Sequence, residues 1–411
     1  MSRRTLAVLL TLVGAALVVA ACAPQPFVCD DAIGCVDIAP GEPIKIAGIE
    51  TISGGTAFLG ISNSNGARLA FDDVNNEFQG HPIEYTVEDS FCNAEGGQAA
   101  GAKVASDPTI VAVIGTTCSS EARPAAGLVS QAGLVMISAS NTNPDLTDPE
   151  HPDHWPGYLR TAHNDLFQGR VAAEFAFNEL GVRSAATIHD GSPYAESLQA
   201  VFADTFEALG GTVTLRTAVN VGDTDMKPVL TTIAADSPEI IYFPIFEPEG
   251  DFIAAQKCEV AGLEDTILMG ADGLLTSGFA GASGDCAVGM YLSGPFVSGD
   301  RVTALLATYT EKFGEEPASG FWAHAYDAAK IILAALEEVA VVDADGTVHI
   351  GRQALRDAMY ATASFDGLTG TLTCDENGDC ATGEALAVFQ VTEAHVAGTE
   401  NLVTSAPFWT P

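Results

Sequence analysis

Positive charge is scarce in this sequence of 411 residues, which has 17 Lys and Arg against 54 Asp and Glu and a formal net charge of −37. A field of this sign repels phosphate backbones and anionic lipid, so we expect no nucleic-acid partner. A solvated acidic surface, of the kind suited to high salt, explains the charge more simply than a specific cationic partner does.

Long apolar runs are also scarce, and after the first 22 residues none could span a bilayer. The chain begins MSRRTLAVLLTLVGAALVVAAC, where two arginines precede an uncharged apolar stretch and small residues lead to Cys22. This is the layout of a secretory signal peptide, and the doublet Arg3-Arg4 leaves twin-arginine export open. LVVAAC resembles the lipobox of bacterial lipoproteins, which implies cleavage before Cys22 and its acylation; the alternative is an ordinary signal peptide. We therefore expect residues 1–22 to form a signal peptide with its lipobox, cleaved before Cys22, and the body to lie outside the cytoplasm, lipid-anchored at the outer face of a membrane or in the periplasm.

Eight further cysteines would then occupy a compartment that permits disulfides. Local spacing suggests that Cys29 pairs with Cys35 and that Cys374 pairs with Cys380. Spacing alone leaves open how the other four pair, which are Cys92, Cys118, Cys258 and Cys286.

The organisation of the body follows from its hydrophobic pattern. Residues 23–43 are rich in Pro, Asp and Gly and predict a tether. From residue 44 onward short apolar strands alternate with helical patterns, which predicts parallel sheets with helices on both faces. The strands are expected at 44–49, 83–89, 110–115, 134–138, 184–190, 240–243 and 266–270. Helices are expected at 193–210, at 321–340, and along one face formed by Ala67, Ala70, Phe71, Val74 and Phe78.

A body of this length needs at least two cores, and the alternation restarts near Asp165. Two doubly wound lobes would face each other with the carboxyl ends of their strands, where such sheets bind ligands.

The stretch GTTCSS (115–120) lies where the strand 110–115 meets a helix that can begin near Ser120. Hydroxyl groups there lie beside unsatisfied backbone N–H groups and the positive end of a helix, which favours an anion. A nucleophile would need a base and an elbow such as G-x-S-x-G, and neither is evident. We therefore interpret GTTCSS as an anion cradle.

A second polar junction follows the next strand in MISASNTNPDLT (136–147), which contains Ser138, Ser140 and Thr142. Alone, this stretch could be an ordinary polar loop. Adjacent parallel strands can, however, bring Ser119 and Thr142 together. His151 and His154 are spaced loosely as metal ligands can be, but the prolines of EHPDHWP indicate a surface turn. We therefore expect no metal or cofactor.

The stretch IGTTCSSEARPAAGLVSQAGLVMISASNTNPDLT resembles the central signature of the periplasmic leucine/isoleucine/valine-binding proteins of ABC importers, which have the type I periplasmic binding fold. Further matches in order are SGGTAFLGISNSNGARLAFDDVN, LRTAHNDLFQG, IHDGSPYAES, GDTDMKPVL and MGADGLLTSGFAGASGDCAVGMY. The resemblance implies two lobes joined by hinge strands, with 44–165 plus 295–365 in the first lobe and 166–294 plus 366–411 in the second.

The resemblance also implies the site residues. Ser119 and Thr142, with backbone groups near Ser140, would hold the carboxylate of an amino acid, and Asp272 would hold its ammonium group. Tyr194 would close over the ligand. The family's usual rim aromatic is Leu59 here, the second closing aromatic is Phe246, and the usual glutamate is the shorter Asp272. A disulfide between Cys92 and Cys118 is implied as well.

These observations predict a monomeric, non-enzymatic solute-binding protein that delivers a small amino-acid-like ligand, a branched-chain amino acid first of all, to an ABC permease. The departures at Leu59, Phe246 and Asp272 leave amides, urea-like solutes and aromatic acids open, and a ligand sensor is a further alternative. The alternative from the class of enzymes is an exported hydrolase that uses Ser119 or Ser120 as its nucleophile.

Overall fold

The computed structural model describes residues 27–381 and 385–411. The expected signal peptide, Cys22 and the first residues of the expected tether lie outside this part of the chain. No helix within the described ranges is long and apolar enough to cross a membrane.

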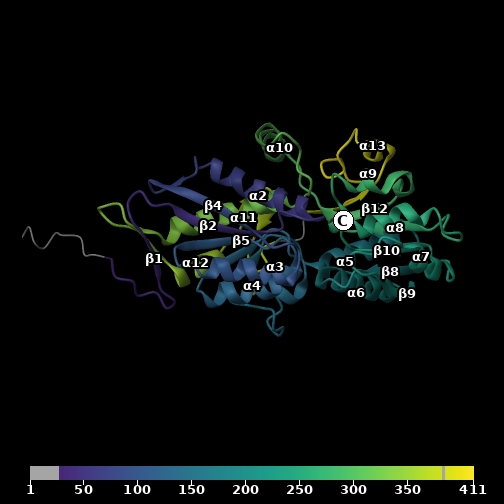
Figure 1. Cartoon of the computed structure of the whole chain (residues 1–411), viewed down its shortest axis with the longest axis horizontal. Coiled ribbons are helices and arrows are strands. Elements are labelled where there is room, and N and C mark those ends of the chain that lie inside the picture. Colours follow the sequence, from purple (N-terminus) through teal and green to yellow (C-terminus); the bar gives the residue numbers. More distant parts are fainter. Residues whose placement is uncertain (1–26, 382–384) are drawn as a thin grey trace, which may run out of the picture.

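The first lobe is built on a six-stranded sheet of order β3-β4-β2-β5-β6-β7, parallel except for the pair β3 and β4. Helices α2 and α11 cover one face and helices α3 and α4 cover the other, each over its own apolar core (Figure 1). The strands are β2 (Ile44–Glu50), β3 (Glu77–Phe78), β4 (His81–Asp89), β5 (Ile110–Gly115), β6 (Val135–Ser138) and β7 (Tyr158–Arg160). The helices are α2 (Ala57–Asp72), α3 (Ala94–Ala105), α4 (Ser119–Gln131) and α11 (Trp322–Val339).

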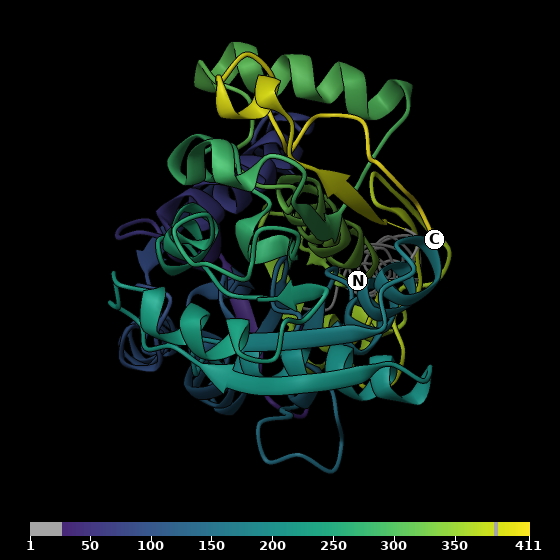
Figure 2. The ribbon, with the colours of Figure 1, turned by 90° about the vertical axis from the view of Figure 1, so that its right-hand side faces the viewer.

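The second lobe has a six-stranded sheet of order β17-β12-β11-β10-β8-β9, in which only β17 runs antiparallel to its neighbour. Figure 2 looks along the molecule from this lobe, with its teal strands in front of the first lobe. The strands are β8 (Ser184–His189), β9 (Thr212–Ala218), β10 (Ile240–Tyr242), β11 (Ile267–Gly270), β12 (Tyr291–Pro295) and β17 (Leu386–Gln390). The helices are α5 (Asp165–Glu174), α6 (Pro193–Ala208), α7 (Lys227–Ala234), α8 (Glu249–Lys257), α9 (Phe279–Ser283) and α13 (Glu393–Val396).

The chain passes between the lobes after β7, again after β12, and a third time before β17. The segments between the second and third passages belong to the first lobe and comprise α10 (Asp300–Phe313), α11, β13 (Val341–Val342), β14 (Val348–Gly351), α12 (Arg352–Tyr360), β15 (Phe365–Gly367) and β16 (Gly370–Leu372). The α/β class with two parallel-sheet lobes and all seven expected strands are therefore confirmed, and the expected helices at 193–210 and 321–340 appear as α6 and α11.

The helix expected through Phe78 is wrong at its end. Helix α2 stops at Asp72, and Asn75 and Asn76 adopt left-handed backbone angles with φ of 56° and 53°. Asparagine tolerates this region better than most residues, so the chain turns there. Phe78 then lies in β3, where it is still buried, because the following hairpin returns it to the same core.

The tether expected at 23–43 is also wrong in its second half. Strand β1 (Cys35–Ile38) pairs antiparallel with β14, and Val36 and Ile38 enter the first-lobe core. The carboxylate of Asp31 accepts hydrogen bonds from the backbone N–H groups of Gln353 and Ala354 at 2.9–3.0 Å, which satisfies the start of α12. Residues 27–38 are thus part of the lobe at its end remote from the second lobe (Figure 1).

The return to the second lobe comes later than the expected boundary at 366. Leu372 and Cys380 are buried in the first-lobe core, and β17 is the next element of the second lobe. The disulfides join Cys29 to Cys35, Cys92 to Cys118, Cys258 to Cys286 and Cys374 to Cys380. The pairs suggested by local spacing and by the resemblance are confirmed.

Candidate ligand-binding site between the lobes

The GTTCSS stretch forms the turn from β5 into α4, and Ser119 is the first residue of the helix. The N–H groups of a first helical turn have no partner within the helix, so those of Ser119 and Ser120 can bind an oxygen of a ligand. The Ser119 hydroxyl accepts a hydrogen bond from the backbone N–H of Asn143 at 3.3 Å. Ser119 and the loop after β6 therefore meet, as the parallel strand order requires.

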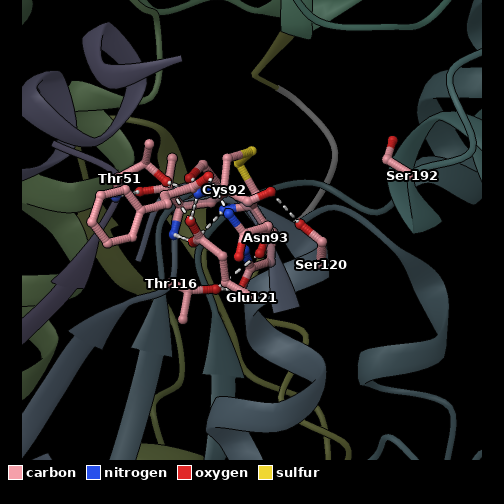
Figure 3. The surroundings of a disulfide bond; sticks show 12 residues. Thr51, Cys92, Asn93, Thr116, Ser120, Glu121 and Ser192 are labelled. Carbon is pink, nitrogen blue, oxygen red and sulfur yellow. Dashed lines mark hydrogen bonds between the residues drawn. A yellow bond between two sulfur atoms is a disulfide. The ribbon is translucent and has the colours of Figure 1, made fainter. Parts of the chain in front are cut away.

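Glu121 holds this turn in place from inside the lobe (Figure 3). Its fully buried carboxylate accepts the backbone N–H groups of Thr117 at 3.1 Å and Cys118 at 3.0 Å. It also accepts the N–H of Cys92 at 2.5 Å and the hydroxyl of Thr51. Because Cys92 is bonded to Cys118, the disulfide and the carboxylate fix the same turn. The start of α4 is thereby rigid before any ligand arrives.

The loop after β6 is held by a buried ion pair. The Arg160 guanidinium is fully buried and pairs with Asp379, which stands in the turn closed by the disulfide between Cys374 and Cys380. Arg160 also donates to the carbonyl oxygens of Asn141 at 3.2 Å and Asn143 at 2.7 Å. These bonds set the conformation of the backbone on either side of residue 142.

Two hydroxyl groups of this loop differ in how they are used. Ser140 Oγ donates to the carbonyl oxygen of Thr117 and accepts from Asn63 Nδ2, both at 2.8 Å. Thr142 Oγ1 is buried and has no hydrogen-bond partner among the described residues. An unsatisfied buried hydroxyl costs roughly 1–3 kcal/mol, so this group is suited to bonding a ligand atom.

Asp272 supplies the negative charge of the second lobe. It follows β11, and its Oδ1 accepts from Tyr194 Oη at 2.9 Å and Gln168 Nε2 at 2.7 Å. Burial raises the pKa of Asp272, and the nearby His163 opposes that rise. The ring of Tyr194 lies 4.9 Å from that of Phe246, so aromatic surface borders the carboxylate.

Asp165 stands beside this group and was missed by the sequence analysis. Asp165 is the first residue of α5 and fully buried, and neither carboxylate oxygen has a partner in the part of the chain that is described. Burial, and then the charge of Asp272, raise the pKa of Asp165 well above its usual range. Its N–H donates to the carbonyl oxygen of Thr142 at 2.9 Å. The only available signal was its place in HNDLFQG, one of the stretches that carry the family resemblance.

A narrow pocket with a cavity volume of about 10 Å³ lies where the lobes meet. Six of the seven expected ligand-binding residues line it, and Thr142 lies outside its wall next to Asp165. The lobes touch beside it, since Asn143 Nδ2 donates to the carbonyl oxygen of Pro193 at 2.7 Å. The lining residues are Leu59, Thr117, Cys118, Ser119, Ser140, Tyr194, Phe246, Asp272, Gly273 and Phe321.

Two other features do not compete with this pocket. A larger open groove of about 600 Å³ at the hinge, which includes Phe167 and Phe296, is lined by residues without charged side chains. The one His, Cys, Asp and Glu cluster of metal-binding size within the described ranges consists of Cys92, Cys118 and Glu121, and both of its sulfurs are in a disulfide.

The family described as periplasmic binding protein matches residues 43–396, which is most of the chain. This chain belongs to the periplasmic binding protein family. Members of this family bind solutes for transport and are not enzymes, and a location outside the cytoplasm accords with the family.

Relatives of this periplasmic binding protein include amino-acid carriers. The leucine-, isoleucine-, valine-, threonine- and alanine-binding protein of Pseudomonas aeruginosa is 28% identical over 82% of this chain and 87% of its own length. The Leu/Ile/Val-binding protein of Escherichia coli is 27% identical over 89% and 96%. A leucine-binding protein from Thermotoga maritima superposes with a TM-score of 0.74 at 25% identity, covering 85% of this chain and 96% of that one.

Proposed function

We propose that this protein is the solute-binding component of an ABC importer and that it binds a branched-chain amino acid between its lobes. The observation that carries the proposal is a pocket with two opposite poles. Its first-lobe wall has hydroxyl groups and a helix start, and its second-lobe wall has the buried carboxyl group of Asp272. An α-amino acid carries one negative and one positive group, which match these poles.

The carboxylate of such a ligand would meet Ser119, the free N–H groups of the first turn of α4, and the unpartnered hydroxyl of Thr142. Its ammonium group would meet Asp272, with the buried carboxyl group of Asp165 beside it. Hydrogen bonds to charged groups contribute roughly 1.5–3 kcal/mol each, so two poles suffice for a tight small ligand.

The side chain of the ligand would lie against the apolar wall of Leu59, Phe246 and Phe321. The relatives named for leucine, isoleucine, valine, threonine and alanine support a ligand of this size. A single methylene changes affinity by only about 10–200-fold in an apolar pocket, so we expect several aliphatic amino acids to bind.

An uncharged or purely acidic ligand is the second candidate. Asp272 already accepts two hydrogen bonds and burial raises its pKa, so a protonated Asp272 could face an amide or an aromatic acid. A solved binding protein from Rhodopseudomonas palustris that shares this fold, at 19% identity and a TM-score of 0.71, was crystallised with 3,4-dihydroxybenzoic acid.

The finer cellular picture is also part of the proposal. Acylation of Cys22 would hold the protein at the outer face of a membrane, where a permease would take up the ligand when the lobes open. Closure around a ligand gives a transporter two shapes to distinguish. Mass spectrometry of the mature N-terminus tests the acylation directly.

A thermal-shift screen of the chain from Ala23 onward tests the ligand, after co-purified ligand has been removed by partial unfolding. A ligand at about 100 times its dissociation constant adds roughly 2.7 kcal/mol of stability. We expect leucine, isoleucine and valine to raise the melting temperature. A rise with benzoate or acetamide alone would replace the amino-acid assignment and remove the proposed role of Asp272.

A further inference from the structure

Glu50 is a buried carboxyl group one hydrogen bond behind the pocket wall. It ends β2 at the edge of the sheet that faces the second lobe, and it is fully buried. Its Oε2 lies 2.5 Å from Thr117 Oγ1, and Thr117 lines the pocket. The Thr117 hydroxyl already accepts the N–H of Thr51 at 2.9 Å.

The same carboxyl group reaches the other hydroxyl of the first-lobe wall. Asn63 Nδ2 lies 3.2 Å from Glu50 Oε2 and 2.8 Å from Ser140 Oγ. Ser140 in turn donates to the carbonyl oxygen of Thr117. Glu50, Asn63, Ser140 and Thr117 therefore form one closed set of hydrogen bonds, of which two members line the pocket.

The buried carboxyl groups of Glu50 and Glu121 both bond Thr117, but they have different numbers of hydrogen-bond partners. Glu121 accepts four donors, two on each oxygen. Glu50 has two partners on Oε2, while its Oε1 has none in the described residues. Burial raises the pKa of Glu50 to about 8. Burial raises the pKa of Glu121 as well, but hydrogen bonds from Thr51, Cys118 and Cys92 oppose that rise, so Glu50, with fewer partners, is the acid that keeps its proton.

The groups around Glu50 do not offset its burial. The buried Tyr85 of β4 lies near it, and Asp89 is its register neighbour at the end of that strand. Arg68 of α2 is the cation that acts on it, but its guanidinium bonds Asn65. Glu121 of α4 is a second negative group.

We propose that Glu50 is a positioning acid of the ligand site. It stays protonated when the ligand binds, and its carboxyl O–H donates a hydrogen bond to Thr117 Oγ1. The Thr117 oxygen then accepts from Glu50 and from Thr51, so its own proton points to a third partner, the carboxylate of the ligand. An ionised Glu50 would instead accept a hydrogen bond from the Thr117 hydroxyl, which would then have no proton to offer the ligand. It would also place a negative charge behind an anion site of low dielectric. The inference rests on the proposed function.

The test is the affinity for L-leucine between pH 6 and pH 9, measured by calorimetry. If only the protein with neutral Glu50 binds, affinity falls about tenfold from pH 7 to pH 9, in proportion to the competent fraction. Glu50→Gln carries a neutral side chain of the same shape, and we expect its affinity to stay level over that range. Comparison of the two proteins at each pH cancels the titration of the leucine amino group.

Two more variants test whether the pH dependence comes from Glu50 and acts through Thr117. Asp251→Asn is the matched control, because burial also raises the pKa of Asp251 to about 8 but the residue does not line the pocket. It should keep the pH dependence of the natural protein. Thr117→Val removes the hydroxyl that links Glu50 to the ligand and should bind weakly at every pH, without the tenfold fall.

The outcomes separate the two proposals. Tight leucine binding that is equal at pH 7 and pH 9, or an unchanged fall in Glu50→Gln, overturns the role of Glu50 and leaves the proposed function intact. A lack of binding by leucine, isoleucine, valine and benzoate at every pH overturns both.

Discussion

The two walls of the pocket are stabilised in different ways. In the first lobe, a carboxylate with four donors, a disulfide and a buried ion pair hold the backbone that carries Ser119 and Thr142. In the second lobe, Asp165 has no hydrogen-bond partner for its carboxylate within the described residues, and Asp272 is held by two side-chain donors. The first wall is a preorganised cradle, whereas the second holds two buried acids whose pKa values are raised by burial, and a cationic group of a ligand would favour the ionised form of Asp272.

The sharpest test of this contrast replaces the charge of the second wall. Asp272→Asn should weaken leucine binding by about 30-fold or more, because removing one partner of a buried charge pair costs roughly 2–5 kcal/mol. The melting temperature of the ligand-free protein should hardly change. Calorimetry with leucine and differential scanning fluorimetry give the two readouts, and full leucine affinity in this variant would refute the ammonium pole.

Asp165→Asn is the companion variant, since it removes a carboxyl group whose burial raises its pKa well above the usual range. We expect it to raise the melting temperature of the ligand-free protein and to weaken leucine binding. A lower melting temperature would show that Asp165 has a structural partner in solution.

The disulfides offer a matched pair, one in each lobe. Replacing either Cys92 and Cys118 or Cys258 and Cys286 by alanine opens loops of 26 and 28 residues, so each should cost about 3 kcal/mol of unfolding free energy. Only the first pair should also lower ligand affinity, because Cys92 N–H bonds Glu121 beneath the cradle. Denaturant unfolding and calorimetry separate the two effects, and equal affinities in both variants would contradict a cradle fixed by its disulfide.

Neighbouring hydroxyl groups test the cradle itself. Ser119→Ala should weaken leucine binding by more than about tenfold, the worth of a hydrogen bond to a charged group. Ser120→Ala is the control, because Ser120 Oγ donates to the carbonyl oxygen of Cys92 at 2.8 Å and lies outside the pocket wall. Similar losses in the two variants would mean that the helix start, not its first hydroxyl, was disturbed.

Stability should also depend on pH. Burial raises the pKa of Glu50 and of Asp251 to about 8 and that of Glu247 to about 7. The folded protein then binds more protons than the unfolded chain above about pH 4.5, so its stability should fall as the pH rises from 5 to 8. Melting temperatures over this range, with Glu50→Gln showing a shallower slope, check the sign. A melting temperature that rises over this range would contradict it.

By itself the sequence determined seven of the strands, several of the helices and the order in which they follow one another. Apolar runs and helical spacing placed every expected strand and the helices α4, α6 and α11, because these patterns are local. The stretch from Gly115 to Ser120 also showed its chemistry, since its place between a strand and a helix follows from neighbouring residues. The boundary error at Phe78 arose because a left-handed turn at Asn75 and Asn76 ended the helix and led into a hairpin. The error at residues 35–38 arose because the distant strand β14, not the local pattern, decided the outcome.

Only the tertiary structure decided which charged groups are buried. Neither the composition nor the hydrophobic pattern near Glu50 and Asp165 distinguishes them from the other acids of so acidic a protein. Their burial depends on segments far away, as does the pairing of Arg160 with Asp379, which lies 219 residues along the chain. The cost of removing a charge from water is set by all the atoms that surround it, and packing of both lobes assembles those atoms.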